Sequence, residues 1–385
     1  MKITLAFDSF KGSLTSLQVA DAFEEGFRSV ICDCEVLKLP IADGGEGTAA
    51  ALVSALGGTM VETIVNDPLG RKITAHYGVI DNGATAVIEM AEASGLTLLA
   101  PSERNPLNTS TEGFGQLILD ALQRGCRRLF LGIGGSATND AGMGMMQALG
   151  FRFLDSYGNE LRGCGASLCN VDYIDCSNVF PALNEAQIVV ACDVNSPFCG
   201  TEGAAYVFAP QKGADDGMVV LLDNGLRHFA TKIEECSGVD VVNVPGAGAA
   251  GGVGGALEAM LGAELRPGAM MVLDALRFNE VVADCDYVFT GEGCVDAQTL
   301  MGKAPAVILQ RAVRLGVPVV AVGGIVEWCE QLRKSLFKAV YPLVVDKSSL
   351  DEAMRPHVAR ENVRRVAAGI AASLLEQRRL LSDFV

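Results

Sequence analysis

Four glycine-rich segments of the sequence combine residues that can bind or transfer a charged group. The first, residues 8–13 (DSFKGS), follows a predicted strand and offers the hydroxyl of Ser9 and the charge of Lys11. Ligands of open α/β sheets bind beyond the carboxyl ends of the strands, so Lys11 is placed to neutralise a phosphate or carboxylate there. The alternative for the hydroxyls is helix capping by Ser13 or Thr15, which leaves Lys11 unexplained.

The second segment, residues 41–48 (IADGGEGT), follows the second predicted strand and opens a helix. Its carboxylates, Asp43 and Glu46, flank a glycine pair where the N–H groups of a helix N-terminus can face an anion. Asp43 can act as a general base or hold Mg²⁺ through water. The alternative for Glu46 is that it only complements the helix dipole.

The third segment, residues 132–144 (GIGGSATNDAGMG), lies between an apolar strand at 128–131 and a helix that runs to Leu149. A turn so rich in Gly, Ser, Thr and Asn can form a nest of N–H donors around phosphate oxygens. The residues expected to bind nucleotide phosphates are Gly134, Gly135, Ser136, Thr138 and Asn139. A plain turn with Asn139 or Asp140 as the N-cap of the helix is the alternative.

The fourth segment, residues 290–299 (TGEGCVDAQT), is predicted to be a short loop with two acids. Glu292 and Asp296 are hard oxygen ligands of the kind that Mg²⁺ uses while it keeps several waters. Lys303, at the start of a predicted helix, suits a phosphoryl oxygen of the nucleotide. The segment therefore predicts a magnesium site.

Residues 246–251 (GAGAAG) match the G-x-G-x-x-G spacing with which dinucleotide-binding proteins approach a pyrophosphate. The match follows a predicted apolar strand at 239–244, but Pro245 and further glycines make it irregular. It supports a rival interpretation, an NAD(P)-dependent oxidoreductase of small hydroxy acids. The P-loop pattern and the H-R-D and D-F-G signatures of protein kinases are absent, so any nucleotide site must be of another type.

Strands and helices alternate along the chain, which is typical of parallel α/β architecture. The sequence predicts two α/β domains, a discontinuous one at 1–65 plus 285–385 and an inserted one at 66–284. Strands are expected at 2–7, 34–39, 59–65, 287–290, 317–322 and 341–345, and helices at 16–29, 46–56 and 305–315. A basic helix closes the chain, and we interpret its arginines as a solvated face.

Composition restricts the class of protein further. The chain has 385 residues, half of them hydrophobic, and a formal net charge of −16, which disfavours nucleic acid as a main partner. Its 12 cysteines contain no CxxC pair and are expected to be reduced and mostly buried. We predict no secretory leader and no membrane span, and hence a cytoplasmic protein.

The four segments together resemble the glycerate kinase family. Two further segments resemble it as well, residues 66–71 (NDPLGR) and residues 193–214, which end in PQKGA. The resemblance covers nearly the whole chain, in order, with departures at Ser196, Ala209 and Ala306–Val307 that concern substrate preference more than the reaction. It implies ATP-dependent phosphorylation of D-glycerate, commonly at the 2-hydroxyl. It also implies a flavodoxin-like, doubly wound domain and a partner domain, with the active site in a cleft between them.

Phosphoryl transfer depends mostly on positioning and on neutralising phosphate charge, and the residues can be assigned roles on that basis. The catalytic set is Asp43, Lys11, Asp193 and Asp296, the Mg²⁺ set is Asp193, Glu292 and Asp296, and the substrate-binding set is Ser9, Lys11, Arg71 and Lys212. Asp43 would orient or deprotonate the glycerate hydroxyl, and Lys303 would join the nucleotide-binding loop. D-glycerate and ATP are the expected substrates; 3-phosphoglycerate as product, a metabolite-binding relative without turnover, and a homodimer stay open.

Overall fold

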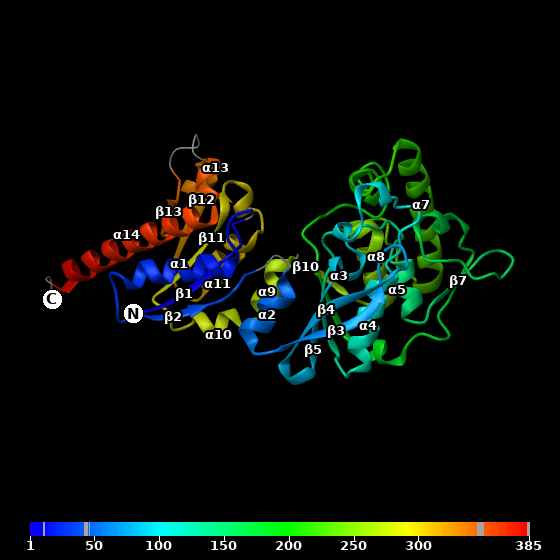
Figure 1. Cartoon of the computed structure of the whole chain (residues 1–385), viewed down its shortest axis with the longest axis horizontal. Coiled ribbons are helices and arrows are strands. Elements are labelled where there is room, and N and C mark those ends of the chain that lie inside the picture. The colour runs from blue at the N-terminus through cyan, green and yellow to red at the C-terminus, as the bar shows by residue number, and fades with distance from the viewer. Residues whose placement is uncertain (11, 42–44, 46, 345–349, 383–385) are drawn as a thin grey trace. The chain divides into compact units, whose positions relative to one another are not determined.

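The computed structural model describes residues 1–10, 12–41, 45, 47–344 and 350–382. It divides into two compact units, each described by itself: unit 1 comprises residues 1–43 and 272–385, and unit 2 comprises residues 44–271. Both are mixtures of helices and mostly parallel strands (Figure 1). The first limit lies before the expected boundary near 65, because residues 59–66 form a strand that pairs within the sheet of unit 2. The second limit lies between residues 271 and 272 rather than near 285.

Unit 1 contains a five-stranded parallel sheet in the order β13-β12-β11-β1-β2. Its strands are β1 (Lys2–Phe7), β2 (Glu35–Lys38), β11 (Tyr287–Val295), β12 (Val319–Val326) and β13 (Ala339–Pro342). Read from its other edge, this is the 2-1-3-4-5 order of flavodoxin-like sheets, whose ligands bind where the strand order reverses. In unit 1 that point lies between β1 and β11, which pair through Phe7 and Gly291.

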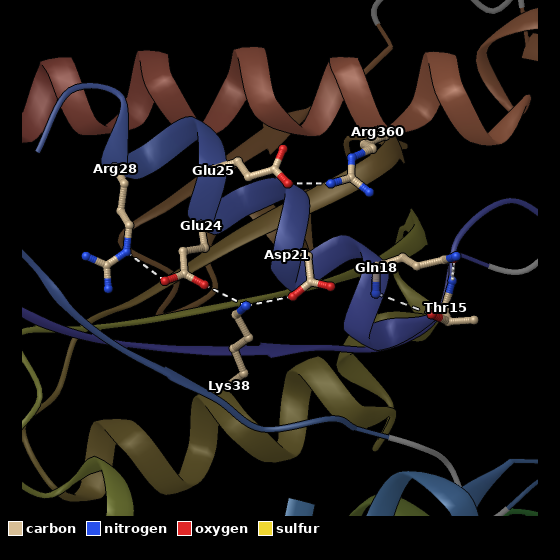
Figure 2. A network of polar contacts seen from close by, with 8 residues as sticks. All are labelled: Thr15, Gln18, Asp21, Glu24, Glu25, Arg28, Lys38 and Arg360. Carbon is tan, nitrogen blue, oxygen red and sulfur yellow. Dashed lines mark hydrogen bonds and ion pairs between the residues drawn. The ribbon is translucent and has the colours of Figure 1, made fainter. Parts of the chain in front are cut away.

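The helices of unit 1 are α1 (Ser16–Arg28), α10 (Phe278–Val282), α11 (Ala304–Arg314), α12 (Glu330–Arg333), α13 (Leu350–Ala353) and α14 (Pro356–Ser382). Helix α1 begins with a capping box, in which Thr15 Oγ1 accepts the N–H of Gln18 and the Gln18 side chain accepts the N–H of Thr15 (Figure 2). Capping by Thr15 is thus confirmed. Lys38 of β2 contacts the central turns of α1, with its Nζ 2.6 Å from a carboxylate oxygen of both Asp21 and Glu24.

Helices α1 and α14 lie side by side (Figure 1) and approach each other closely at Gly26. A Cβ atom at this position would lie 2.1 Å from the carbonyl oxygen of Arg364. Arg360 and Arg364 of α14 both form ion pairs with Glu25 of α1, the first of which is drawn in Figure 2. Arg360, Arg364 and Arg365 are exposed, as the sequence suggested, and the first two in addition form ion pairs between α14 and α1.

Unit 2 contains a six-stranded sheet in the order β10-β9-β6-β5-β4-β3. Its strands are β3 (Thr59–Asn66), β4 (Lys72–Ile80), β5 (Thr85–Glu89), β6 (Arg128–Gly132), β9 (Gln187–Ala191) and β10 (Glu264–Arg266). The neighbours from β5 to β10 are parallel, whereas β3 and β4 are antiparallel. The carboxyl ends of the four parallel strands therefore meet at one edge. A separate two-stranded sheet pairs β7 (Arg152–Leu154) with β8 (Tyr173–Asp175).

The helices of unit 2 are α2 (Thr48–Leu56), α3 (Ala91–Ser94), α4 (Glu112–Gln123), α5 (Met143–Ala148), α6 (Ala204–Phe208), α7 (Asp216–Ser237) and α8 (Ala249–Leu261), and α9 (Gly268–Ala275) spans the boundary with unit 1. The strand predicted at 239–244 is wrong, since these residues form irregular structure with a turn at 242–243. Without that strand, the G-x-G-x-x-G match lacks the strand–turn–helix context of a dinucleotide site. Its glycines instead allow close packing: a Cβ on Gly251 would lie 2.3 Å from the carbonyl oxygen of Thr138.

Two smaller findings concern sequence expectations. Five of the 12 cysteines are buried, three are partly exposed and four are exposed, so the expectation that most are buried is wrong. The strand predicted at 341–345 begins earlier, at Ala339, and ends at Pro342, while residue 345 lies outside the described residues. In the part of the chain that the structure describes, helices both long enough and apolar enough to cross a bilayer are absent.

Candidate active site

Lys212 is a buried cation at the glycine-rich segment that follows β6. The short 3₁₀ helix Pro210–Lys212 carries it, and the residue is only 1% exposed. Its Nζ donates to Ser136 Oγ at 2.7 Å and to the carbonyl oxygen of Thr138 at 2.6 Å. Burial lowers the pKa of Lys212 from its ordinary 10.5 to about 7, against the attraction of Asp140. The structure thus places Lys212, which the sequence analysis assigned to substrate binding, in contact with Ser136 and Thr138, which it assigned to nucleotide binding.

Unsatisfied polar atoms occur in the same segment that Lys212 contacts. An ammonium group has three N–H donors, and two of those on Lys212 have partners among the described residues. Thr138 Oγ1 and both polar atoms of the Asn139 side chain are buried without a hydrogen-bond partner there. Leaving such groups unsatisfied costs roughly 1–3 kcal/mol each, so this arrangement is suited to water or an anionic ligand.

Asp140 organises the segment from within. It is completely buried, and its carboxylate accepts the N–H and Oγ1–H of Thr111, both at 2.8 Å. It also accepts the N–H groups of Gly142 and Gly144 at the start of α5. Burial raises the pKa of Asp140, although these hydrogen bonds act in the opposite direction. The N-cap residue of α5 is Gly142, with φ 71°. Asp140 lies two residues earlier and stabilises the start of the helix by accepting the N–H groups of Gly142 and Gly144.

Arg71 and Asp193 occupy other places in unit 2. The guanidinium of Arg71 forms ion pairs with Asp67 at 2.5 Å and Glu103 at 2.7 Å, and these partners raise its pKa. Its charge is thus already balanced by two carboxylates. Asp193 follows β9, and its Oδ1 accepts the N–H of Gly268 at 3.1 Å, just beyond β10. It therefore lies at the edge where the parallel strands end.

In unit 1, polar groups gather where the strand order reverses. The Asp8 N–H donates to the carbonyl oxygen of Gly291 at 2.9 Å, and the Ser9 N–H donates to Asp8 Oδ1 at 2.6 Å. Glu292 lies within β11, whereas the sequence predicted a loop there. Its Oε2 lies 3.2 Å from Lys303 Nζ, and its Oε1 is buried without a partner among the described residues.

A second group of possible ligands follows at the ends of β11 and β12. One ligand atom each from Cys294, Asp296 and Glu327 lies within 4.8 Å of the others. The backbone brings them together, because the N–H of Glu327 donates to the carbonyl oxygen of Val295. Asp296 Oδ1 also accepts the N–H of Thr299 at 3.0 Å, which fixes the turn after β11.

Lys11, Asp43 and Glu46 lie outside the described residues. The structure does show what holds the flanks of the second segment. Glu89, at the end of β5, accepts the N–H of Gly47 at 2.9 Å and of Ala49 at 2.7 Å, and so anchors the start of α2.

Comparison with known proteins decides the family. The model of the glycerate kinase family matches residues 3–375. The chain belongs to the glycerate kinase family. It is 45% identical to the glycerate 2-kinase of Escherichia coli K12 over 97% of this chain and 98% of that protein. It is 48% identical to the glycerate kinase of Halalkalibacterium halodurans over 92% and 93% of the two chains.

A solved structure is similar along the whole length. The protein from Salmonella typhimurium LT2 provisionally assigned as glycerate kinase 2 has a TM-score of 0.89, with 44% sequence identity, over 98% of this chain and 99% of that one. The resemblance to the glycerate kinase family, the α/β fold class and the prediction of an enzyme of this family are therefore confirmed. The individual site residues remain predictions.

Three acidic residues that contact or lie near the candidate site were not predicted from the sequence as site residues. Glu89 is the last residue of the buried strand β5, and a carboxylate at the end of an apolar strand could have indicated a functional position from the sequence. Asp140 was considered only as a helix cap, although the aspartate lies in a segment of small residues that leaves it buried. Glu327 has no local signal, because only the register of β11 and β12 brings it to Asp296.

Proposed function

We propose that this enzyme transfers the γ-phosphoryl group of ATP to the C2 hydroxyl of D-glycerate, giving 2-phosphoglycerate, ADP and a proton. The name of the relative from Escherichia coli, glycerate 2-kinase, supports this position, at 45% identity over nearly the full chain. Transfer to the 3-hydroxyl is the second candidate product. The oxidoreductase alternative loses its basis, because the strand required before residues 246–251 is not formed.

The observation that carries the proposal is the buried ammonium group of Lys212. It retains an unused donor and lies beside Thr138 and Asn139, whose side chains lack partners among the described residues. A charge held away from water interacts strongly with an incoming anion, because solvent screens the attraction less. Lys212 and the loop Gly134–Asn139 would thus bind an anionic group of the reactants, a phosphate oxygen or the glycerate carboxylate.

Carboxylates of unit 1 support the proposal of a magnesium ion. The buried Glu292 Oε1 without a partner and the carboxylates of Asp296 and Glu327 are oxygen donors of the type that Mg²⁺ prefers. Glu292 and Asp296 would hold the ion, with Asp193 as the further ligand proposed from the sequence. When bound, the ion would neutralise negative charge on the nucleotide phosphates.

The remaining assignments concern the acceptor hydroxyl and the substrate charge. Asp43 would accept the proton of the C2 hydroxyl while the oxygen of that hydroxyl attacks the γ-phosphorus and ADP leaves. Ser9 and Lys11 would contact the substrate, and Lys303 would contact the nucleotide phosphates from beside Glu292. Because Arg71 is held by Asp67 and Glu103, it would reach a substrate carboxylate only by exchanging one of these partners.

The test is an ADP-release assay with Mg²⁺-ATP and D-glycerate, followed by ³¹P NMR of the product. A 2-phosphoglycerate signal is expected, and a 3-phosphoglycerate signal would overturn the assigned position while keeping the kinase. The Asp43→Asn variant should lose about 10²-fold or more in kcat. Lys38→Met serves as its matched control, since Lys38 belongs to the ion pairs of α1 and β2. An Asp43→Asn protein with unchanged turnover would refute the role of the base.

A further inference from the structure

Two exposed thiols lie in contact with each other in unit 2, away from the residues assigned to catalysis. Cys176 directly follows β8 and Cys236 is in the last turn of α7, and their sulfur atoms are 3.1 Å apart although the residues are 60 positions apart in sequence. Both side chains are exposed. The other two exposed cysteines, Cys32 and Cys169, have no sulfur partner among the described residues. The arrangement of Cys176 and Cys236 is therefore particular to this pair.

The backbone on both sides of the pair is fixed independently of the sulfur atoms. Ile174 of β8 and Ile233 of α7 are buried in the same hydrophobic core. His228, two turns before Cys236 on α7, has its Nε2 2.6 Å from the carbonyl oxygen of Val171. Because both elements are anchored within a few residues of the thiols, the sulfur atoms stay close without a covalent bond. Closing a bond of about 2.05 Å requires them to approach by only about 1 Å.

A pocket of about 470 Å³ opens at the thiols and gives a reagent access to them. Its lining includes three carboxylates, Asp172, Asp175 and Glu235, and one cation, Lys232. The excess of negative charge favours a cationic or neutral reagent over an anionic one. Partial burial of the sulfur atom, together with the neighbouring Cys236 thiol, raises the pKa of Cys176 to about 12. This slows its reaction, so the feature that favours the pair is the proximity of the two sulfur atoms rather than their acidity.

We propose that Cys176 and Cys236 are a redox modification site, which a small cationic or neutral disulfide converts into an internal disulfide bond. One protein thiol loses its proton to the solvent, and the resulting thiolate attacks a sulfur of the reagent RSSR, forms a mixed disulfide and releases RS⁻, which takes up a proton. The second thiolate attacks the protein sulfur of that mixed disulfide and releases the other RS⁻. In total, two protein thiols lose two electrons and two protons, and RSSR is reduced to two RSH. The product joins α7 to β8.

The experiment treats the whole chain with cystamine, a cationic disulfide, and maps its cysteines by mass spectrometry after blocking free thiols. The expected result is a peptide pair linked through Cys176 and Cys236, with loss of two free thiols per chain. Because the bond closes a loop of some 60 residues and so restricts the unfolded chain, the Tm of unit 2 should rise by about 5 °C. Dithiothreitol should reverse both changes.

Cys176→Ser and Cys236→Ser should abolish the linked peptide and the rise in Tm, whereas the matched control Cys169→Ser, also at an exposed thiol, should keep both. A stable mixed disulfide at either cysteine without the internal bond would overturn the proposal, as would a crosslink between other cysteines. None of these readouts uses glycerate or ATP, so the outcome is independent of the proposed function.

Discussion

Replacing Lys212 with methionine distinguishes the effect of the buried charge on folding free energy from its effect on the binding of an anion. The folded state holds the Lys212 pKa at about 7, against an ordinary 10.5, because the side chain is buried. At about 1.4 kcal/mol per pH unit, this difference corresponds to about 5 kcal/mol of destabilisation when the group is charged. Methionine removes this penalty but leaves Ser136 Oγ and the Thr138 carbonyl without their donor, at about 1–3 kcal/mol each. The variant should therefore be more stable than the wild type by about 1 kcal/mol near pH 6.

The sign of the pH dependence follows from the same values. Between pH 7 and 10.5 the unfolded chain binds a proton at Lys212 that the folded chain has released, so the free energy of unfolding of the wild type rises with pH. The advantage of Lys212→Met should shrink by about 1.4 kcal/mol per pH unit above pH 7 and reverse before pH 10. Urea unfolding of both proteins from pH 6 to 9.5, followed by circular dichroism, measures this difference directly.

Lys38→Met is the matched control with the opposite sign. Burial alone would lower the pKa of Lys38, but hydrogen bonds to Asp21 and Glu24 outweigh it and raise the pKa. Its stabilisation is thus fully present below pH 10.5 and is lost only as the pH rises through the folded-state pKa, so this variant should be destabilised evenly from pH 6 to 9.5. A stability difference between Lys212→Met and wild type that does not vary with pH would refute the reasoning about the buried charge.

In the kinase assay, Lys212→Met should lower kcat/KM by about 10²-fold or more, and wild-type activity would refute the proposal that Lys212 binds an anion.

Three further variants test other parts of the structure. Gly26→Ala should lower the free energy of unfolding of unit 1 by about 1–3 kcal/mol in urea titrations, because its Cβ would push α14 away at Arg364; an unchanged midpoint would contradict this packing. Asp140→Asn presents an amide to the donors of Thr111 and should cost about 2 kcal/mol in the same measurement, whereas wild-type stability would show that the carboxylate is not needed. Glu292→Gln should reduce kcat at least about 10-fold and raise the Mg²⁺ concentration for half-maximal rate without loss of stability, and the metal assignment fails if that concentration stays the same.

The order of elements could be predicted because it depends on local patterns. Alternating apolar strands and amphipathic helices indicated the α/β class, and capping by Thr15 depends only on the four residues from Thr15 to Gln18. The sheet to which a strand belongs is not a local property. The strand expected at residues 59–65 was assigned to the first domain, but it pairs with β4 in the sheet of unit 2.

The site was predictable to the extent that its groups lie in recognisable segments. The segment Gly134–Asn139 and Lys212 were both expected to bind anions, from glycine content and from resemblance, yet nothing in the sequence shows that Lys212 donates to Ser136. That contact joins residues 76 positions apart in sequence. Burial also escaped prediction, because lysine is usually exposed, and the displaced pKa of Lys212 depends entirely on burial.

A chain with a net charge of −16 repels phosphates and carboxylates at long range, and its local cations must overcome this. Exposed arginines contribute little, because solvent screens them and their own partners balance them, as Asp67 and Glu103 balance Arg71. Burying Lys212 removes the screening but costs folding free energy. An anion bound there would restore the pKa of Lys212 toward its ordinary value, so that the free energy lost on folding is recovered on binding. Lys212, whose burial costs folding free energy, is for that reason the strongest candidate in unit 2 for contact with a reactant.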